Sequence, residues 1–338
     1  MPHAIGDSMY LMVLLRDLLR QGDDLTLIGG VIYPLRHWFP DISPERYIPD
    51  PVDDAARDAL LGRFDRIVQM FPRPMAGRLL AEDPSVAPRL LRLVELPGFY
   101  SRAHVLFALM AAGRTHLGLR DTVTDAAAGV SRGNGMRPPA PLRHREHVTR
   151  VVIHPVASNT FKTWDAAKFV RLAQGLRRRG LRPCFAVPPD DADAWRLRAG
   201  GIDVAAFAAL PDLAGFLYTS GWFIGNDSGI GHLASALDIP TLSIFPRKGL
   251  AQRWHPRRHA PDGAMPRMHA DVGTDTDTPG NAAAVAEAGT ASRTYNVVVL
   301  PMPLLPTTKL KERYWRGLMP VSRVLAAFDR QRRTIETP

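Results

Sequence analysis

From about residue 150 onward, strand-like and helix-like segments alternate regularly, and this alternation constrains the fold more than any other feature of the sequence. Apolar runs such as "RVVI" and "PCFAV" are typical of strands buried on both faces of a sheet. The segments between them have helical periodicity, as in "DAAKFVRLAQGLRRRG", which ends at a glycine. Strand, helix and strand in succession predict βαβ units on a parallel sheet.

The first half of the chain alternates less regularly but contains the same kinds of segment. Residues 8–22 predict a helix, and 24–30 and 64–72 predict strands, so we expect a second α/β domain. Residues 131–147 combine Gly, Pro and basic residues without apolar periodicity, as an interdomain linker would. The expected units are a Rossmann-like domain at 1–140, a second one with parallel sheet at 148–315, a mobile loop at 261–293 and a C-terminal helix at 316–338.

The totals describe a soluble globular protein of 338 residues, of which 46% are hydrophobic and 22% charged. No apolar run reaches the ~18 residues that a membrane-spanning helix needs. The N-terminus lacks the basic start of a signal peptide. Cys184 is the single cysteine, which excludes an internal disulfide and a multi-cysteine metal site and indicates a reducing compartment such as the cytoplasm.

The net charge of +10 favours anionic partners, among them phosphates and anionic lipid headgroups. Basic residues do not interleave with aromatic side chains in the way that stacks bases, so a nucleic-acid partner is not expected. The three arginines at 177–179 lie at a predicted helix end, where cations suit the helix dipole. We interpret them as a solvated helix terminus.

The stretch "GNDSGIGHLASALDIP" at 225–240 places polar residues directly before a predicted helix. A helix that follows a parallel strand begins at the carboxyl edge of the sheet, where its unpaired N–H groups form an anion site. Gly229 permits close backbone approach, Ser228 adds a hydroxyl, and His232 can donate to the same oxygens. Asp227 would repel a phosphate, so it caps the helix, orients His232 or faces hydroxyl or amine donors of a ligand. The simpler alternative is that Asp227 or Ser228 is only an N-cap and that His232 is an ordinary histidine with its hydrogen bonds satisfied.

A second polar loop follows the strand predicted near residue 150 and precedes a helix that starts near Asp165. It carries four side chains able to contact an anion, namely Ser158, Asn159, Thr160 and Lys162. In a parallel sheet both loops lie at one edge, so they can face one ligand, and Lys162 adds positive charge. Taken alone, Lys162 would be an ordinary surface lysine.

Together the two loops resemble glycosyltransferase family 9, the bacterial ADP-heptose:lipopolysaccharide heptosyltransferases and their relatives. The resemblance rests on "HPVASNTFKTW" at 154–164 and "NDSGIGHLASALDIPTLSIF" at 226–245. Membership implies a two-domain GT-B fold in which the C-terminal domain binds the nucleotide sugar and the N-terminal domain binds the acceptor. On this resemblance, the residues that bind the nucleotide sugar are Ser158, Lys162, Asp227, Ser228, Gly229 and His232.

Two segments depart from the family pattern. Where members carry a glycine pair and then a glutamate, this chain has "VPPDDADAW", so the role of the glutamate falls to Asp190, Asp191 or Asp193, or is absent. After the last matched strand, "PRKGLAQRWHPRR" replaces the usual "G-P-T-x-P" run. Its basic residues either bind phosphate or are solvated loop charges; those considered are Arg247, Lys248, Arg253 and His255.

At the N-terminus, "AIGDSMYLMVLLRDLL" resembles the family's "G-D-x-x-x-x-x-P-x-L-x-x-L" segment, whose aspartate is the proposed general base. That residue is Asp7 here. An inverting transfer needs one carboxylate to take the proton of the acceptor hydroxyl. Lys162 and a helix N-terminus would stabilise the departing diphosphate, so the resemblance implies no metal and no cofactor. The structural alternative for Asp7 is an N-cap of a helix that starts at Ser8.

The leading interpretation is an inverting, metal-independent glycosyltransferase that moves a sugar, with heptose from ADP-heptose as the first candidate, onto lipopolysaccharide or a related surface glycan. The positive charge suits a nucleotide-diphosphate sugar and an anionic glycolipid acceptor, and it is compatible with peripheral attachment to the inner-membrane surface. Two alternatives stay open: a sugar-nucleotide epimerase of the same fold, and a non-catalytic protein that binds an anionic glycan or nucleotide.

Only "MPHAI" precedes Gly6, where the family has a first β-strand, and this segment is too short and too polar for a central strand. Loss of a central strand leaves backbone groups unpaired or forces the neighbouring strands together. We therefore expect an N-terminal domain without its first strand. Our hypothesis is that the start is internal to a longer reading frame, and the alternative is a sheet that has closed over the gap.

Overall fold

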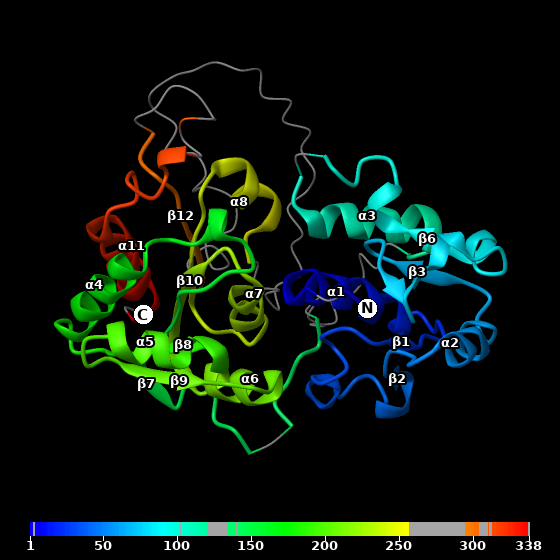
Figure 1. Cartoon of the computed structure of the whole chain (residues 1–338), viewed down its shortest axis with the longest axis horizontal. Helices are drawn as coiled ribbons and strands as arrows, with labels where there is room; N and C mark the ends of the chain where they lie inside the picture. The colour runs from blue at the N-terminus through cyan, green and yellow to red at the C-terminus, as the bar shows by residue number, and fades with distance from the viewer. Residues whose placement is uncertain are drawn as a thin grey trace.

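The computed structural model describes residues 1–2, 4–101, 103–120, 134–139, 141–256, 295–303, 310 and 313–336. Figure 1 shows two α/β halves side by side, the N-terminal half on the right and the C-terminal half on the left. The loop predicted at 261–293 lies outside the described residues. Within these ranges, no helix is both long enough and apolar enough to cross a membrane.

A six-stranded sheet forms the centre of the C-terminal half, and its strand order is β12, β11, β10, β7, β8, β9. All five pairings are parallel. In the middle of the sheet, Ile224 pairs with Ile153 on one side and with Leu242 on the other. The strands are β7 His147–His154, β8 Arg182–Val187, β9 Asp203–Ala206, β10 Ser220–Asn226, β11 Thr241–Ile244 and β12 Asn296–Val299. The parallel sheet predicted from the alternation is confirmed.

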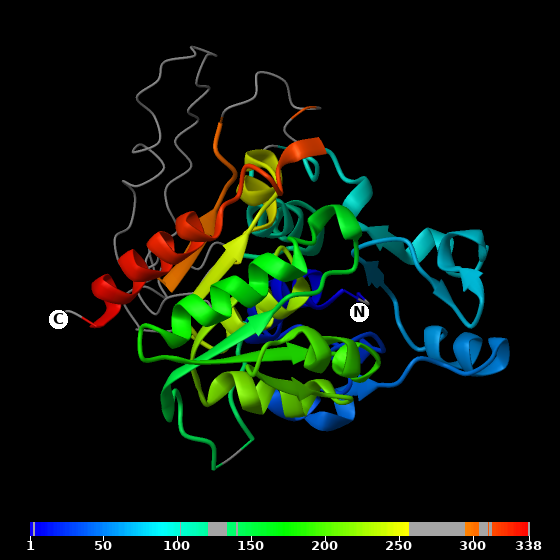
Figure 2. The same cartoon turned by 60° about the vertical axis from the view of Figure 1, so that its left-hand side comes forward.

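Helices cover both faces of this sheet (Figure 2). The described helices of this half are α4 Ala166–Arg177, α5 Ala192–Arg198, α6 Leu210–Tyr218, α7 Gly229–Ala236, α8 Lys248–Trp254 and α11 Val321–Glu336. Ile153 and Ile224 point into a core shared with α4, α5 and α11, whereas Val152 and Phe223 point into a core shared with α6 and α7. Both faces of the strands are therefore buried, which is why their sequences read as continuous apolar runs.

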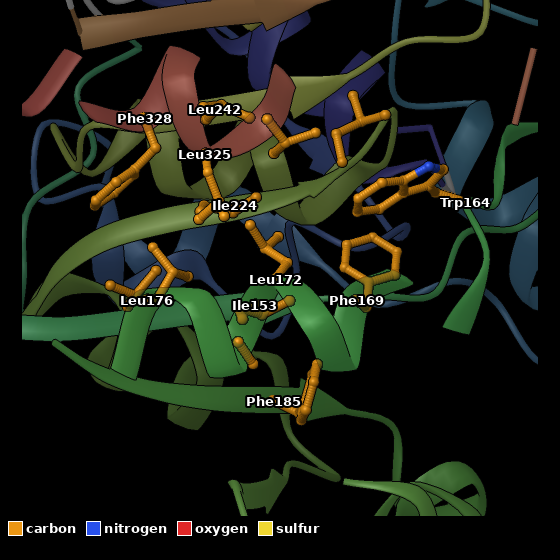
Figure 3. Packing of buried hydrophobic residues seen from close by; sticks show 14 of the residues in the cluster. Ile153, Trp164, Phe169, Leu172, Leu176, Phe185, Ile224, Leu242, Leu325 and Phe328 are labelled. Carbon is orange, nitrogen blue, oxygen red and sulfur yellow. The ribbon is translucent and has the colours of Figure 1, made fainter. Parts of the chain in front are cut away.

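Figure 3 shows the first of these cores, where Phe169, Leu172 and Leu176 of α4 lie against the sheet. Phe328 comes from α11, the helix expected at 316–338, which begins at Val321 directly after a proline. Burial of these large side chains fixes α4 on the sheet, at roughly 1.5–3 kcal/mol for each one that is fully buried.

The N-terminal half contains helices and short strands whose order matches an α/β unit, but its sheet is not continuous. Its helices are α1 Ile5–Arg20, α2 Asp54–Leu61 and α3 Val105–Leu117. Its strands are β1 Leu27–Ile28, β2 Tyr47–Ile48, β3 Ile67–Gln69, β4 Pro74–Met75, β5 Arg78–Leu79 and β6 Leu90–Arg92. They form three separate pairs, β1–β2 and β3–β6 parallel and β4–β5 antiparallel. This differs from the expected Rossmann-like sheet, because runs of two or three residues offer too few hydrogen bonds to join the pairs.

Among the described residues no strand precedes α1. The N-terminal amino group of Met1 donates a hydrogen bond to the carbonyl oxygen of Ile28 at 2.6 Å, beside the end of β1. The first residues thus pack against the end of a strand.

Helix α1 joins the two halves. It packs against α7 of the C-terminal half and α3 of the N-terminal half (Figure 1). Met9 and Met12 enter the core that contains α7, while Tyr10, Leu11 and Leu14 enter a core shared with α3. A helix that is apolar on nearly all sides is typical of a buried position between two layers. Residues at the start of α1 are therefore held at the junction of the halves.

Candidate functional site

The two polar corners predicted from the sequence meet at the carboxyl edge of the sheet. One follows β7 and contains η7, a single 3₁₀ turn at Thr160–Lys162; the other lies between β10 and α7. Strands β7 and β10 are adjacent and parallel, which brings both corners to one edge. The ammonium of Lys162 lies 2.7 Å from Oδ2 of Asp227. This ion pair is the centre of the candidate site.

Asp7 belongs to the same cluster, although it comes from the other half of the molecule. The helix begins at Ile5 with Ala4 as N-cap, so Asp7 lies inside the first turn and the N-cap alternative is wrong. Burial raises the pKa of Asp7 to about 6; the charge of Lys162 partly counteracts the shift and the charge of Asp227 adds to it. A carboxyl group with its pKa near neutrality is suited to accept and release protons.

Asp227 and Ser228 do not act as helix caps. Ser228 occupies the N-cap position of α7, but its side chain makes no capping bond, and its hydroxyl oxygen is buried without a hydrogen-bond partner. The side chain of Asp227 is 4% exposed and pairs with Lys162. Burial raises the pKa of Asp227, and Lys162 pulls it back. A buried hydroxyl without a partner beside an ion pair is a feature that needs an explanation, and a bound ligand would provide one.

His232 lies in the contact between α1 and α7. Its ring packs edge-on against Tyr10, with ring centroids 5.1 Å apart. Burial lowers the pKa of His232 to about 3, so the ring is neutral at physiological pH. A Cβ atom added at Gly6 would lie 2.7 Å from Cδ2 of His232, and one added at Gly229 would lie 2.8 Å from Cβ of Ile5. Both glycines of the predicted motifs therefore allow the first turns of α1 and α7 to touch.

Ser158 lies exposed on the loop between β7 and η7. In the same loop, Oδ1 of Asn159 accepts a hydrogen bond from the backbone N–H of Phe161 at 2.8 Å, so that side chain caps the 3₁₀ turn. The structure thus brings Asp7, Lys162, Asp227 and His232 together and places Ser158 at the rim. Gly229 begins α7 at the centre of this group.

Two of the four basic residues after β11 have a role that the sequence did not suggest. The guanidinium of Arg253 donates to the carbonyl oxygens of Ser101, at 2.8 Å, and Phe99. The carbonyl oxygen of His255 accepts from the hydroxyl of Tyr10 at 2.6 Å. Both contacts join the C-terminal half to the N-terminal half. Arg247 and Lys248 lie exposed at the start of α8.

The aspartates considered for the missing glutamate lie at the carboxyl end of β8, on the same edge of the sheet as the two corners. Asp190 and Asp191 belong to η8 at Pro189–Asp191. Asp193 is exposed and pairs with Arg196 at 2.7 Å. Their position is compatible with contact to a nucleotide. Within the described ranges, no group of three or more His, Cys, Asp or Glu side chains could hold a metal ion.

Sequence reasoning missed the residues that hold the Lys162 loop. Asn226 is fully buried, and its amide bonds to the loop on both sides. Arg316 donates to two carbonyl oxygens of the Lys162 turn. Asn226 directly precedes Asp227 in the quoted motif, so its position was a usable signal, whereas no local pattern connects Arg316 with residues about 150 positions earlier.

Comparison with known proteins finds similarity to one family over part of the chain. A family model described as glycosyltransferase family 9 (heptosyltransferase) matches residues 107–259. Lipopolysaccharide heptosyltransferase 3 of Escherichia coli is 34% identical over 103 residues, which are 28% of this chain and 30% of that protein. The chain thus matches less than a third of the length of this curated relative.

Solved structures extend the similarity to the fold. The family 9 glycosyltransferase from Veillonella parvula superposes with a TM-score of 0.59 at 13% identity, over 98% of each chain. The E. coli heptosyltransferase WaaC, solved with ADP, superposes with a TM-score of 0.50 at 16% identity, over 75% of this chain and 88% of that one. These likenesses show the GT-B fold. The family model over residues 107–259 and the curated relative over 103 residues thus show similarity to glycosyltransferase family 9 in part of the chain, and the solved structures share its fold.

Proposed function

We propose that this protein is an inverting glycosyltransferase that transfers a sugar from a nucleotide-diphosphate donor to a lipopolysaccharide or related surface-glycan acceptor. The observation that carries the proposal is the cluster of Asp7, Lys162 and Asp227 at the junction of the two halves. One half contributes a carboxyl group with raised pKa, and the other contributes a cation at an anion-binding corner. Sugar transfer uses both: a base for the acceptor hydroxyl and a cation for the departing diphosphate.

In the proposed reaction, ionised Asp7 takes the proton of the acceptor hydroxyl. The hydroxyl oxygen forms a bond to the anomeric carbon of the donor sugar while the bond from that carbon to the diphosphate oxygen breaks. The electron pair of the broken bond leaves with the nucleoside diphosphate. The pKa of Asp7, raised to about 6, makes it a stronger base than an ordinary carboxylate while it stays mostly ionised at neutral pH.

Lys162 would stabilise the departing diphosphate, together with the N-terminal turn of α7. The charge of Lys162 takes the part that a metal ion has in other transferases, so the proposed reaction needs neither a metal nor a cofactor. Its present partner is Asp227, so donor binding would require Lys162 to share or exchange that contact. The unpartnered hydroxyl of Ser228 is a further donor at the same place.

ADP-heptose is the proposed donor, and two similarities support it. The curated relative is named a lipopolysaccharide heptosyltransferase, and WaaC was solved with ADP. The net charge of +10 supports an anionic glycolipid as acceptor and a peripheral position on the cytoplasmic side of the inner membrane.

The test is release of ADP from ADP-heptose, measured with and without a heptose-deficient lipopolysaccharide acceptor. We expect release only when both are present, and little release when ADP-glucose replaces ADP-heptose. Conversion of the donor sugar without acceptor would indicate an epimerase instead, and absence of any reaction with every acceptor tested would contradict the proposed activity.

A further inference from the structure

The side chain of Asn226, at the end of the neighbouring strand β10, holds the loop that carries Lys162. Oδ1 of Asn226 accepts from the backbone N–H of Trp164 at 3.0 Å, and Nδ2 donates to the carbonyl oxygen of Pro155 at 2.8 Å. Pro155 and Trp164 are the two ends of the loop that contains Lys162. One fully buried amide therefore fixes both ends, and Asn226 is adjacent in sequence to Asp227, the ion-pair partner of Lys162.

The other side of the same turn is held by residues that precede α11. Nε of Arg316 donates to the carbonyl oxygen of Thr163 at 2.7 Å, and Nη2 donates to that of Thr160. The indole N–H of Trp315 donates to the carbonyl oxygen of Phe161 at 3.0 Å. Three carbonyl groups flanking Lys162 thus bond to two consecutive side chains from the far end of the sequence.

Trp164 anchors the C-terminal end of the loop. Its indole is 1% exposed, packs edge-on against Phe169, and donates to the carbonyl oxygen of Met319 at 3.1 Å. The ammonium of Lys168 also donates to the carbonyl oxygen of Arg316. The segment 315–319 is therefore itself fixed to α4 and its preceding loop, so it can act as a rigid support.

Such support matters because Lys162 is a flexible cation on a short 3₁₀ turn. A lysine side chain has many accessible rotamers, and an isolated turn of this kind is a weak structure. A guanidinium offers several donors in a fixed fork, so one arginine can hold two carbonyl groups at a set spacing. The ammonium of a lysine in the same place could not hold two carbonyl groups at a set spacing in this way.

We propose that Asn226 and Arg316 are positioning residues, which fix the turn of Lys162 from its two sides and thereby set the affinity for the nucleotide diphosphate. The inference rests on the proposed function, since it takes Lys162 as the group that contacts the diphosphate. Neither residue needs to contact the ligand. Their effect passes through the backbone of residues 155–164.

The first test is Arg316→Lys, which keeps the positive charge but loses the fork. ADP affinity is measured by isothermal titration calorimetry, with Arg316→Met as a companion. We expect both variants to weaken ADP binding at least tenfold, because both release the two carbonyl groups. If Arg316→Lys binds ADP with parental affinity, the positioning role of Arg316 is overturned. If, in addition, Arg316→Met binds ADP more weakly, Arg316 acts on ADP by its charge.

Arg179→Lys is the matched control. Arg179 lies just beyond the C-terminal end of α4, where its guanidinium bonds Asp329 and the carbonyl oxygen of Gly175. It likewise connects distant segments but lies away from the site. ADP affinity should change less than twofold in this variant, and a loss equal to that of Arg316→Lys would contradict a specific effect.

The second test compares Asn226→Leu with Gln331→Leu. Gln331 is also buried, and its amide donates to the carbonyl oxygens of Thr241 and Tyr295. Each change removes two hydrogen bonds of a buried amide, so Tm should fall in both, but ADP affinity should fall only in Asn226→Leu. Equal affinities in the two variants would overturn the role of Asn226.

If the parent protein fails to bind ADP, the proposed function fails. If the parent protein binds ADP and the Arg316 and Asn226 variants bind it equally well, only the present inference fails.

Discussion

The two halves of the molecule are built in different ways and contribute different parts of the candidate site. The C-terminal half has a continuous six-stranded parallel sheet with helices on both faces, whereas the described strands of the N-terminal half form three separate pairs. The two polar corners that contain Lys162 and Asp227 lie at the edge of the large sheet. Asp7 lies on α1, a helix held by packing between the halves.

The difference indicates how the function is divided. The C-terminal half has the rigidity and the helix terminus that ligand binding needs, so binding of the donor should depend on it. In the proposed function, the N-terminal half contributes the base Asp7 through a single helix, and that base would act only in the chemical step. Mutations in the two halves should therefore affect binding and turnover separately, and the following predictions test this separation.

The largest expected effect is that of Asp7→Asn on turnover. The amide cannot accept the proton of the acceptor hydroxyl, so the rate of transfer should fall by roughly 10²–10⁴-fold. The measurement is acceptor-dependent release of ADP. Asp23→Asn, an exposed change just after α1, is the control and should keep the parental rate. A rate near that of the parent in Asp7→Asn would mean that the base lies elsewhere.

The next effect concerns pH. Because the pKa of Asp7 is raised to about 6, kcat/KM should fall about tenfold per pH unit below pH 6 as the base becomes protonated. Protonated Asp7 cannot take the proton of the acceptor hydroxyl, so activity decreases as pH decreases. A pH–rate profile measures this. A profile that stays flat down to pH 5 would contradict the assignment of Asp7 as base.

The smallest expected effect concerns the contact between the halves. In Gly6→Ala the new Cβ would lie 2.7 Å from the ring of His232, so α1 and α7 must separate slightly. We expect a loss of about 1–3 kcal/mol in the free energy of unfolding, as for other overpacked sites. Gly249→Ala is the control, because a Cβ there meets no atom within 4 Å. Equal stability of the two variants, measured by denaturant unfolding, would show that the contact tolerates the added methyl group.

The sequence predicted the C-terminal half well, because each strand and helix there has strong periodicity and a clear end signal. It predicted α1 for the same reason. The N-terminal strands were harder, because pieces such as β1 and β2 are two residues long and carry almost no periodic signal. The sequence therefore indicated an α/β unit in this half without locating its short strands.

For the site, the two loop motifs located Lys162 and Asp227 correctly at one edge, since parallel strands impose that geometry. The positions of Arg253 and Arg316 could not be predicted, because their partners lie about 150 residues away and are set by tertiary packing. Local patterns do not encode such contacts. Gly6 was quoted only as part of a motif, and its contact with His232 became visible once α1 and α7 were seen together.

The central claim is that the C-terminal half binds the donor diphosphate through Lys162 while Asp7 acts only in the chemistry. Titration of ADP into Lys162→Ala and Asp7→Asn in parallel tests it most directly. Loss of a charged hydrogen bond should cost on the order of 1.5–3 kcal/mol, which corresponds to roughly 10- to 150-fold weaker binding in Lys162→Ala, and Asp7→Asn should bind as the parent does or slightly better. Unchanged affinity in Lys162→Ala, or an equal loss in both variants, would contradict the account.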